Sequence, residues 1–424
     1  MNFQFKIGKD ICFCPETTLK FHPSFDVAYW ENNLLLLSDF VFSIGMIELI
    51  SYWKATCSPL VQVGVGNLDN GAVSFWKKLY YHGLGEFFYR NSVQTNLADF
   101  MNIEIEPSHK KELPFFELKD ETIVPVGGGK DSVVTLELLR TSDKITPMII
   151  NPRNATLNTV QTGGFSGNFF EIQRNIDPVL LELNSQGFLN GHTPFSAMLA
   201  FYSVLLAVVS GKKNAALSNE SSANEATVIG LDVNHQYSKS YEFEADFREY
   251  VSKYLSKEVN YYSFLRPLSE LQIGYLFSKQ TDYFSAFKSC NAGSKTDEWC
   301  CNCAKCLFTF IILSPFISAE CLTKIFGKNL FEEKKLLPIL LELCGLAKEK
   351  PFECVGTIKE VCLALIQAMK QYDNLPFLLQ YFAKTPLYEQ YRDVNFEEQM
   401  QALNTPHFLP DKELNLLKKY LYNK

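Results

Sequence analysis

The sequence lacks an excess of positive charge. Its 40 lysine and arginine residues are outnumbered by 47 aspartate and glutamate residues, so the formal net charge is -7 and the isoelectric point is about 5.6. A protein built mainly to hold nucleic acid usually presents a basic surface. The charge balance therefore argues against nucleic acid as a partner, although an acidic chain can carry a basic cleft.

Long hydrophobic runs are also missing. The longest, such as 197–209 and 307–313, are too short to cross a bilayer. The start, MNFQFKIGKDICFC, has neither the apolar core nor the cleavage-site pattern of a secretory signal. We therefore expect a cytoplasmic protein with no membrane partner. The sequence contains no internal repeat and no pattern that indicates an oligomeric state.

The length and composition are those of a globular protein with more than one domain. The chain has 424 residues, of which 47% are hydrophobic and 21% charged. Residues 1–112 mix helix and strand patterns, and a charged, turn-rich stretch follows near 107–114. From 326 the apolar residues recur at three- and four-residue spacing. We predict a mixed α+β region at 1–112, a central domain at 113–325 and a helical region at 326–424.

The central region alternates strand, loop and helix patterns, which is typical of an α/β fold with an open, mostly parallel sheet. Ligands bind such sheets at the carboxyl ends of the strands. The loops expected to converge there are 127–132, 151–158 and 218–224. The predicted segments are strand and loop 121–129, helix 131–142, strand and loop 145–156, helix 194–211, and strand and loop 213–224.

Three glycines stand between a predicted strand and a predicted helix in VPVGGGKDS, residues 124–132. Bare backbone amides at the start of a helix form an anion site suited to phosphate. The stretch is not a Walker A loop, because that motif needs glycine at 124 and Ser or Thr at 131. It cannot be read as the dinucleotide fingerprint either. The alternative is a tight turn that uses glycine for its geometry alone.

Twelve cysteines in a chain without a secretion signal indicate thiols or a metal site rather than disulfides. Four of them, Cys290, Cys300, Cys303 and Cys306, are spaced C-x9-C-x2-C-x2-C, and Cys301 is an extra. Thiolates at this spacing can converge on one tetrahedral ion, so we predict a structural Zn²⁺ site. The alternative is a group of buried or reactive thiols without metal.

Two other polar stretches carry candidate residues. His192 and Thr193 precede a predicted helix, with Thr193 expected as its cap and His192 near the ligand end of the sheet. The long polar loop that begins at 218 is a binding candidate, although a solvated loop is the alternative for each residue. Its candidates are Asn219, Glu220, Asp232, Asn234, His235, Ser238 and Lys239, whereas His22, His82, His109 and His407 are expected to be structural or exposed.

The glycine loop resembles the S-G-G-x-D-S loop of the N-type ATP pyrophosphatase (PP-loop) superfamily, with Gly127 in place of the first serine. The resemblance implies an adenine-nucleotide α-hydrolase-like central domain that splits ATP between its α and β phosphates. It implies that Gly127, Gly128, Gly129 and Ser132 cradle pyrophosphate, that Asp131 holds Mg²⁺, and that Lys130 offsets charge. The converging loops add Asn151, Ser218, Asn219 and Glu220 as cofactor-binding candidates. A similar cysteine cluster occurs in the deazaguanine-synthase branch.

Several stretches together resemble the UDP-N-acetyl-α-D-muramoyl-L-alanyl-L-glutamate epimerase family of peptidoglycan synthesis, over about residues 115–365. They are VPVGGGKDS, GHTPFSAMLA, LSNESSANE, GLDVNHQYSKSYEFE, WCCNCAKCLF and KPFECVGTIKEV. The resemblance implies an ATP- and Mg²⁺-dependent enzyme that inverts the terminal L-Glu of UDP-MurNAc-L-Ala-L-Glu, with AMP and pyrophosphate as products. Candidates for the base, in order, are His192, Asp232, His235 and Cys354, and Arg153 and Lys239 are expected near phosphates.

Other functions stay open at this stage. An RNA-modifying ligase or thiolase shares the loop and the adenylation but would require a basic surface. An amide ligase or deazaguanine-type synthase would use the same adenylate with an amine. A nucleotide or metal sensor without catalysis would release no pyrophosphate.

Overall fold

The computed structural model describes residues 1–422 except 67, 106–111, 225–235, 291 and 294–295. The strands are β1 (Phe5–Ile7), β2 (Ile11–Phe13), β3 (Glu16–Leu19), β4 (Leu60–Val63), β5 (Asn102–Ile105), β6 (Lys119–Pro125), β7 (Ile145–Ile150), β8 (Phe170–Asn175), β9 (Lys212–Leu217) and β10 (Asn260–Ser263). The helices are α1 (Val27–Asn33), α2 (Ser38–Trp53), α3 (Asn70–Gly83), α4 (Gly85–Arg90), α5 (Lys130–Leu139), α6 (Asn154–Thr162), α7 (Pro178–Ser185), α8 (Phe195–Val209), α9 (Tyr241–Tyr254), α10 (Glu270–Ser278), α11 (Ala304–Leu313), α12 (Ala319–Phe326), α13 (Leu337–Leu343), α14 (Ile358–Met369), α15 (Phe377–Phe382), α16 (Pro386–Tyr391), α17 (Phe396–Gln401) and α18 (Asp411–Tyr422).

A six-stranded sheet in the order β10-β9-β6-β7-β8-β3 forms the centre of the molecule. Its first five strands are parallel, and β3 joins the β8 edge antiparallel. The prediction of an α/β fold with a mostly parallel sheet is therefore confirmed. Three strands of this sheet, β3, β8 and β10, were not predicted from the sequence.

The sheet reverses its direction of growth between β6 and β9. From β6 the chain builds β7 and then β8 on one side, and it then crosses back to place β9 and β10 on the other. Ligands of open parallel sheets bind outside the carboxyl ends of the strands at such a switch point. The loops that leave β6 and β9 there are the glycine loop and the polar loop that begins at 218.

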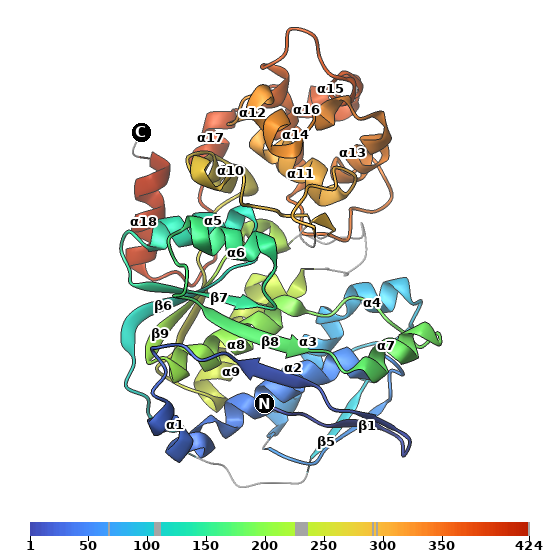
Figure 1. Ribbon diagram of the computed structural model, residues 1–424. Helices are drawn as coiled ribbons and strands as arrows, with labels where there is room; N and C mark the ends of the chain where they lie inside the picture. Colours follow the sequence, from blue (N-terminus) through green and yellow to red (C-terminus); the bar gives the residue numbers. More distant parts are fainter. Residues whose placement is uncertain (67, 106–111, 225–235, 291, 294–295, 423–424) are drawn as a thin grey trace.

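Neighbouring residues of each central strand face two different hydrophobic cores. Ile123 of β6 and Ala215 of β9 belong to one core, whereas Val124 and Ala216 belong to the other. Helices α5, α6, α10 and α18 cover one face, beyond which the other C-terminal helices gather. Helices α8 and α9 cover the opposite face together with α2 and α3 (Figure 1). The alternation of side chains along a strand thus places a separate core on each face of the sheet.

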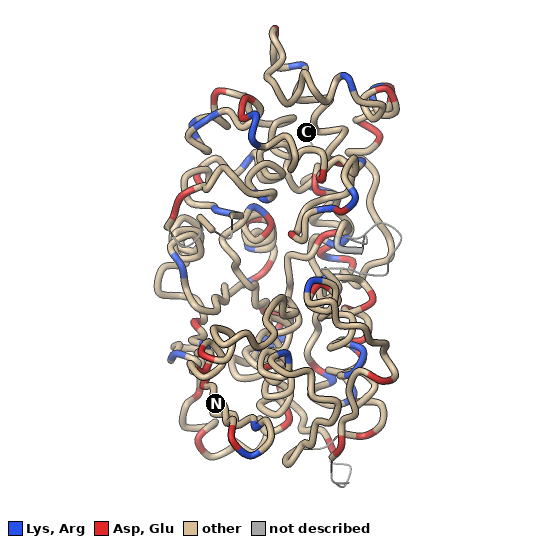
Figure 2. The backbone as a smooth tube through the Cα atoms, turned by 90° about the vertical axis from the view of Figure 1, so that its right-hand side faces the viewer, with Lys and Arg blue, Asp and Glu red and all other residues tan. Residues whose placement is uncertain are grey.

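Packing continues across both predicted domain boundaries. Strand β3 completes the central sheet, and α2 packs against α8. The helices from α12 onward share a core with α5 and α10, and their helical character agrees with the prediction for 326–424. The divisions at 112 and 325 stay predictions. Acidic and basic residues are interspersed through both halves of the molecule (Figure 2).

One helical run, Val27–Trp53, is long and apolar enough to cross a membrane by length and composition. It overlaps neither of the apolar runs noted in the sequence, 197–209 and 307–313. Half of its most apolar part is buried inside the structure. Its Glu48 is 1% exposed and pairs with Arg174 Nε at 2.6 Å, which joins α2 to β8. The expected absence of a membrane partner stays a prediction.

Candidate active site

The glycine loop turns the chain from the end of β6 into α5. Gly129 takes the N-cap position of α5, and its residue type brings no side-chain oxygen to the first amides of the helix. Gly128 has a φ of +80°, and a Cβ there would lie 2.9 Å from the backbone carbon of Ala155. A Cβ on Gly127 would meet no atom of the described residues within 4 Å. Glycine is therefore required at 128 by backbone conformation and by contact, whereas position 127 has room for a side chain.

A segment from the far end of the central region holds this loop in place. The Lys288 amide donates a hydrogen bond to Gly128 O at 2.8 Å. A Cβ on Gly129 would lie 2.9 Å from Ser289 Oγ. The next residue along this segment is Cys290. The loop is thus gripped between the start of α6 and the segment that opens the cysteine cluster.

The four predicted metal-binding thiols converge, because their sulfur atoms all lie within 4.8 Å of one another. Cys290 and Cys303 Sγ are 3.8 Å apart, and Cys306 Sγ lies 3.6 Å from both Cys300 and Cys303. Four thiolates around a tetrahedral Zn²⁺ with bonds of about 2.3 Å require sulfur separations of about 3.8 Å. Cys301 Sγ instead contacts Phe326 O at 3.2 Å. The donor set and spacing fit a structural zinc ion, which stays a prediction.

Lys130 is turned into the protein rather than toward solvent. It is 3% exposed, and its ammonium hydrogen-bonds to Asp131 Oδ1 at 2.5 Å and to Glu270. Burial opposes the charged form of Lys130, yet Asp131 and Glu270 raise its pKa above the ordinary value. The Asp131 side chain keeps 32% exposure, which suits a residue predicted to hold Mg²⁺. If Lys130 offsets phosphate charge as predicted, it does so while its ammonium group is paired with Asp131 and Glu270.

Glu270 extends the cluster to the C-terminal helices. Burial raises the pKa of its carboxyl group above the ordinary value, and Lys130 opposes this shift while Asp131, Glu220 and Glu360 add to it. Its amide donates to Glu360 Oε1 at 2.7 Å, and Glu360 Oε2 accepts from the Thr357 amide at 2.7 Å. The glycine loop is therefore connected through side chains to the start of α14, just after the KPFECVG stretch.

Lys239 and Cys354 come together from loops that are more than a hundred residues apart. The Lys239 ammonium hydrogen-bonds to the Cys354 sulfur and lies in the field of Glu220 and Asp131. Burial by itself would lower the pKa of Lys239, but these negative groups raise it above the ordinary value. Glu220 is 1% exposed, and Arg266 Nη1 holds its backbone oxygen at 2.6 Å. The structure thus gathers three predicted residues, Glu220, Lys239 and Cys354, near Asp131 of the glycine loop.

His192 lies at the start of α8, on the carboxyl side of the sheet as predicted. Its Nδ1 is 3.4 Å from Glu86 Oε2 of α4. Lys54, which is 5% exposed, donates to Gly191 O at 2.5 Å and to Thr193 Oγ1 at 2.8 Å. Burial lowers the pKa of Lys54 to about 8, with Arg174 adding to the effect and Glu86 opposing it. The prediction of Thr193 as a helix cap is wrong, because Pro194 takes that position and the threonine hydroxyl serves Lys54.

Other predicted residues have structural partners or cannot be placed. Asn151 bridges two strands, with Oδ1 accepting from the Arg174 amide at 2.7 Å, and Asn219 donates to Ser263 Oγ at 3.0 Å. Arg153 is the N-cap of α6. The Ser218 hydroxyl is buried with no hydrogen-bond partner among the described residues. Asp232, Asn234 and His235, and also His109, lie outside the described residues.

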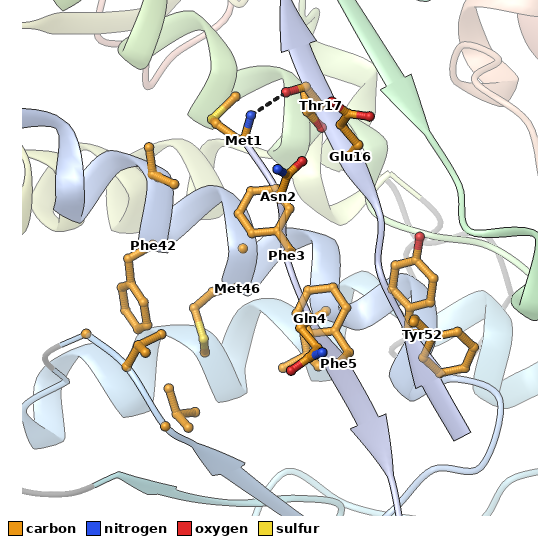
Figure 3. Close-up of a pocket in the computed structure, with 18 of the residues that line it drawn as sticks. Met1, Asn2, Phe3, Gln4, Phe5, Glu16, Thr17, Phe42, Met46 and Tyr52 are labelled. Carbon is orange, nitrogen blue, oxygen red and sulfur yellow. Dashed lines mark hydrogen bonds between the residues drawn. The ribbon is translucent and has the colours of Figure 1, made fainter. Parts of the chain in front are cut away.

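A large apolar cavity of about 1600 Å³ lies elsewhere, on the N-terminal segment. Figure 3 shows Phe42 and Met46 of α2 on one side of it, and Phe5 of β1 with the preceding Phe3 on the other. Its described lining residues include none of the predicted site residues. Cavity size alone would therefore have directed attention away from the charged cluster at the switch point.

Three residues that contact the predicted site residues were not predicted from the sequence. Glu270, Glu86 and Ser289 are not part of any contiguous motif with the residues that they contact. The stretch from Ser269 to Gln272 does form a capping box at the start of α10, but that pattern explains the start of a helix rather than a site. Long-range contact alone identifies these residues.

The fold and the loop together define an α/β protein with a glycine loop at the switch point of a mostly parallel sheet. The family model described as the MurL N-terminal domain matches residues 1–264, and that described as the MurL C-terminal domain matches residues 286–392. The chain belongs to the MurL family.

Three relatives carry the name UDP-N-acetyl-alpha-D-muramoyl-L-alanyl-L-glutamate epimerase. The Xanthomonas oryzae pv. oryzae relative is 35% identical over 75% of this chain and 71% of its own length. The Salinispora tropica relative is 36% identical over 76% of this chain and 71% of its own length. The Micromonospora relative is 34% identical over 78% of this chain and 76% of its own length.

Proposed function

We propose that the chain epimerises the terminal L-Glu of UDP-MurNAc-L-Ala-L-Glu to D-Glu in the synthesis of peptidoglycan precursors. The main observation in support is the glycine loop at the switch point of the sheet, which is held on both sides by contacts with α6 and with Lys288 and Ser289. The relatives of the chain are named for this reaction. We further propose that the reaction consumes ATP and proceeds through an adenylated carboxylate, in the cytoplasm.

Removal of the Cα proton explains why the proposed reaction consumes ATP. Inversion at Cα requires the loss of its proton, and a carbanion beside a free carboxylate would place two negative charges together. Attack of the carboxylate oxygen on the α phosphorus of ATP releases pyrophosphate and leaves an uncharged acyl carbon as electron sink. A base then removes the Cα proton and a proton returns to the opposite face. Water releases AMP and restores the carboxylate, so the sum is ATP and water giving AMP and pyrophosphate.

The backbone of Gly127 to Gly129 and the first amides of α5 would hold the pyrophosphate as it forms, because uncapped amides favour anions. Asp131 would hold Mg²⁺, which neutralises phosphate charge when bound. Cys290, Cys300, Cys303 and Cys306 would hold a zinc ion whose contribution is structural, since four sulfurs complete its coordination. The buried Lys130–Glu270 pair would fix the direction of the loop.

The test is incubation of the purified protein with UDP-MurNAc-L-Ala-L-Glu, ATP and Mg²⁺, followed by chiral analysis of glutamate and assay of pyrophosphate. We expect D-Glu to accumulate with AMP and pyrophosphate in equal amounts. Asp131→Ala should lose substrate-dependent pyrophosphate release. Inversion without ATP would reject the adenylation step, and release of pyrophosphate only with an added amine would identify a ligase instead.

A further inference from the structure

Two oppositely polarised pairs of titratable side chains lie at the carboxyl side of the sheet. One pair joins an imidazole to a carboxylate, with His192 Nδ1 3.4 Å from Glu86 Oε2. The other joins a thiol to an ammonium, with the Lys239 side chain hydrogen-bonded to Cys354. The first pair belongs to the starts of α8 and α4, and the second to the polar loop and the KPFECVG stretch.

A short chain of contacts links the two pairs. Arg90 Nε donates to Glu86 Oε1 at 2.7 Å, and the guanidinium lies 4.8 Å from the centre of the Phe352 ring. The Tyr89 ring packs 5.6 Å from the same phenylalanine, and its hydroxyl donates to Glu349. The segment that carries Cys354 is therefore fastened onto α4, two residues beyond Phe352, and the same helix carries the carboxylate that holds His192.

The two pairs place partners of opposite charge beside the two proton-transfer groups. An ammonium group hydrogen-bonded to a cysteine favours the thiolate, which is a base. A carboxylate beside a histidine favours the imidazolium, which is an acid. Inversion of a carbon centre in a site that holds the substrate still requires one group of each kind, placed on opposite faces of the carbon.

We propose that Cys354 and His192 are the two catalytic residues that move the Cα proton, with Lys239 and Glu86 as their positioning residues. The inference rests on the proposed function. The Cys354 thiolate takes the proton from Cα of the adenylated L-Glu, and the electron pair of the C–H bond moves into the acyl group. The His192 imidazolium gives its proton to the opposite face and restores the C–H bond. Exchange with solvent returns the cysteine to the thiolate and the histidine to the imidazolium before the next turnover.

Deuterium exchange separates the two roles. The reactions use the full chain, the L-Glu substrate, ATP and Mg²⁺ in heavy water, with pyrophosphate assayed in parallel. For His192→Asn we expect deuterium at Cα with retained L configuration, because the cysteine still removes the proton and returns a deuteron to the same face. Inversion should fall by about 10²- to 10⁴-fold, the usual contribution of general acid–base catalysis. For Cys354→Ala we expect neither deuterium nor inversion while pyrophosphate is still released.

Glu86→Gln tests the positioning role through the ratio of exchange to inversion. We expect that ratio to rise above the wild-type value, which a loss of stability alone would not produce. Cys321→Ala is the matched cysteine control, since Cys321 lies on α12, outside both pairs, and it should exchange and invert at the wild-type rate.

Each contrary outcome has a defined meaning. Deuterium in the Cys354→Ala product, wild-type inversion by His192→Asn, or loss of exchange in His192→Asn would overturn the assignment. Loss of pyrophosphate release in a folded Cys354→Ala protein that binds ATP would place Cys354 in adenylation and also overturn it. Absence of pyrophosphate release in the wild-type protein would instead reject the proposed function. Cys354→Ser and His192→Gln replace any variant that does not fold.

Discussion

At the scale of the residue, Gly128 is the most constrained position of the glycine loop. Its φ of +80° costs an L-residue about 1–2 kcal/mol. A methyl group there would also press on the backbone of Ala155 and Thr156, which cannot move without shifting α6. The first prediction is that Gly128→Ala lowers pyrophosphate release by about 100-fold, the cost of a displaced reacting group.

Gly211→Ala is the matched control for this prediction. Gly211 has a φ of +66°, and a Cβ there meets no described atom within 4 Å. The control should therefore lose only the φ cost of about 1–2 kcal/mol in urea unfolding and keep pyrophosphate release. Equal activity of the two variants would contradict the proposed role of the loop.

The second prediction concerns the pH dependence of stability through Lys54. Its pKa is lowered to about 8 by burial, against an ordinary value of 10.5. Between these values the unfolded chain binds more protons than the folded one, so the free energy of unfolding rises with pH. We expect a gain approaching about 3 kcal/mol between pH 8 and 10.5, relative to Lys54→Met. Urea unfolding of both proteins across this range measures it, and parallel pH curves would contradict it.

The site residues that the sequence predicted are those that lie close together in the chain. The glycine loop and the cysteine cluster were found because each is a short stretch in which phosphate or metal binding requires a characteristic spacing. The contacts of Lys130 with Glu270 and of Lys239 with Cys354 were not, because each joins distant parts of the chain. Thr193 was misjudged because Lys54, the buried residue that ends α2 as its C-cap, donates a hydrogen bond to its hydroxyl.

At the scale of the element, the third prediction concerns residues 288–306 (the cysteine segment) and the glycine loop that Lys288 and Ser289 contact. Cys303→Ser should reduce the zinc content of the purified protein from about one ion per chain to near zero, because structural zinc sites need all four ligands. Pyrophosphate release should fall with it, since Lys288 and Ser289 precede the cluster and hold the loop backbone. Metal analysis and the pyrophosphate assay on the same preparations measure both effects.

Cys301→Ser is the neighbouring control, because that sulfur contacts Phe326 O instead of the cluster. It should keep both metal and activity. Full zinc content in Cys303→Ser, or equal metal loss in the two variants, would contradict a four-cysteine site.

Periodicity located the elements that are long or strongly apolar. The buried helix α8 and strands β6, β7 and β9 follow directly from their patterns. Strand β8 carries Glu171, Gln173 and Arg174 in six residues, and β10 has only four residues, so neither has a strong strand pattern. Their place in the sheet depends on pairing with neighbours that are distant in sequence.

At the scale of the whole molecule, the two cores share one sheet. Neighbouring residues of β6, β7, β9 and β10 belong to different cores. Because both cores are built on these strands, unfolding of one core would expose apolar side chains of the other to water. The fourth prediction is a single cooperative unfolding transition. Three tryptophans, Trp30, Trp53 and Trp76, lie in the N-terminal segment and Trp299 in the cysteine segment.

Fluorescence of Trp299 alone, in a protein with the other three replaced by phenylalanine, should follow the same urea curve as far-UV circular dichroism of the same protein. Two separate transitions would support independent domains near the predicted boundaries at 112 and 325. Those boundaries were predicted from local composition, which does not reveal that β3 pairs with β8 at the edge of the central sheet.

The most direct test of the account is a single reaction in heavy water. The wild-type protein is given UDP-MurNAc-L-Ala-L-Glu, ATP and Mg²⁺, and glutamate is released and analysed for configuration and for deuterium at Cα. The account predicts D-Glu carrying one deuterium at Cα, with one pyrophosphate formed for each adenylation. D-Glu that retains its original Cα hydrogen, or inversion that proceeds without pyrophosphate, would contradict it.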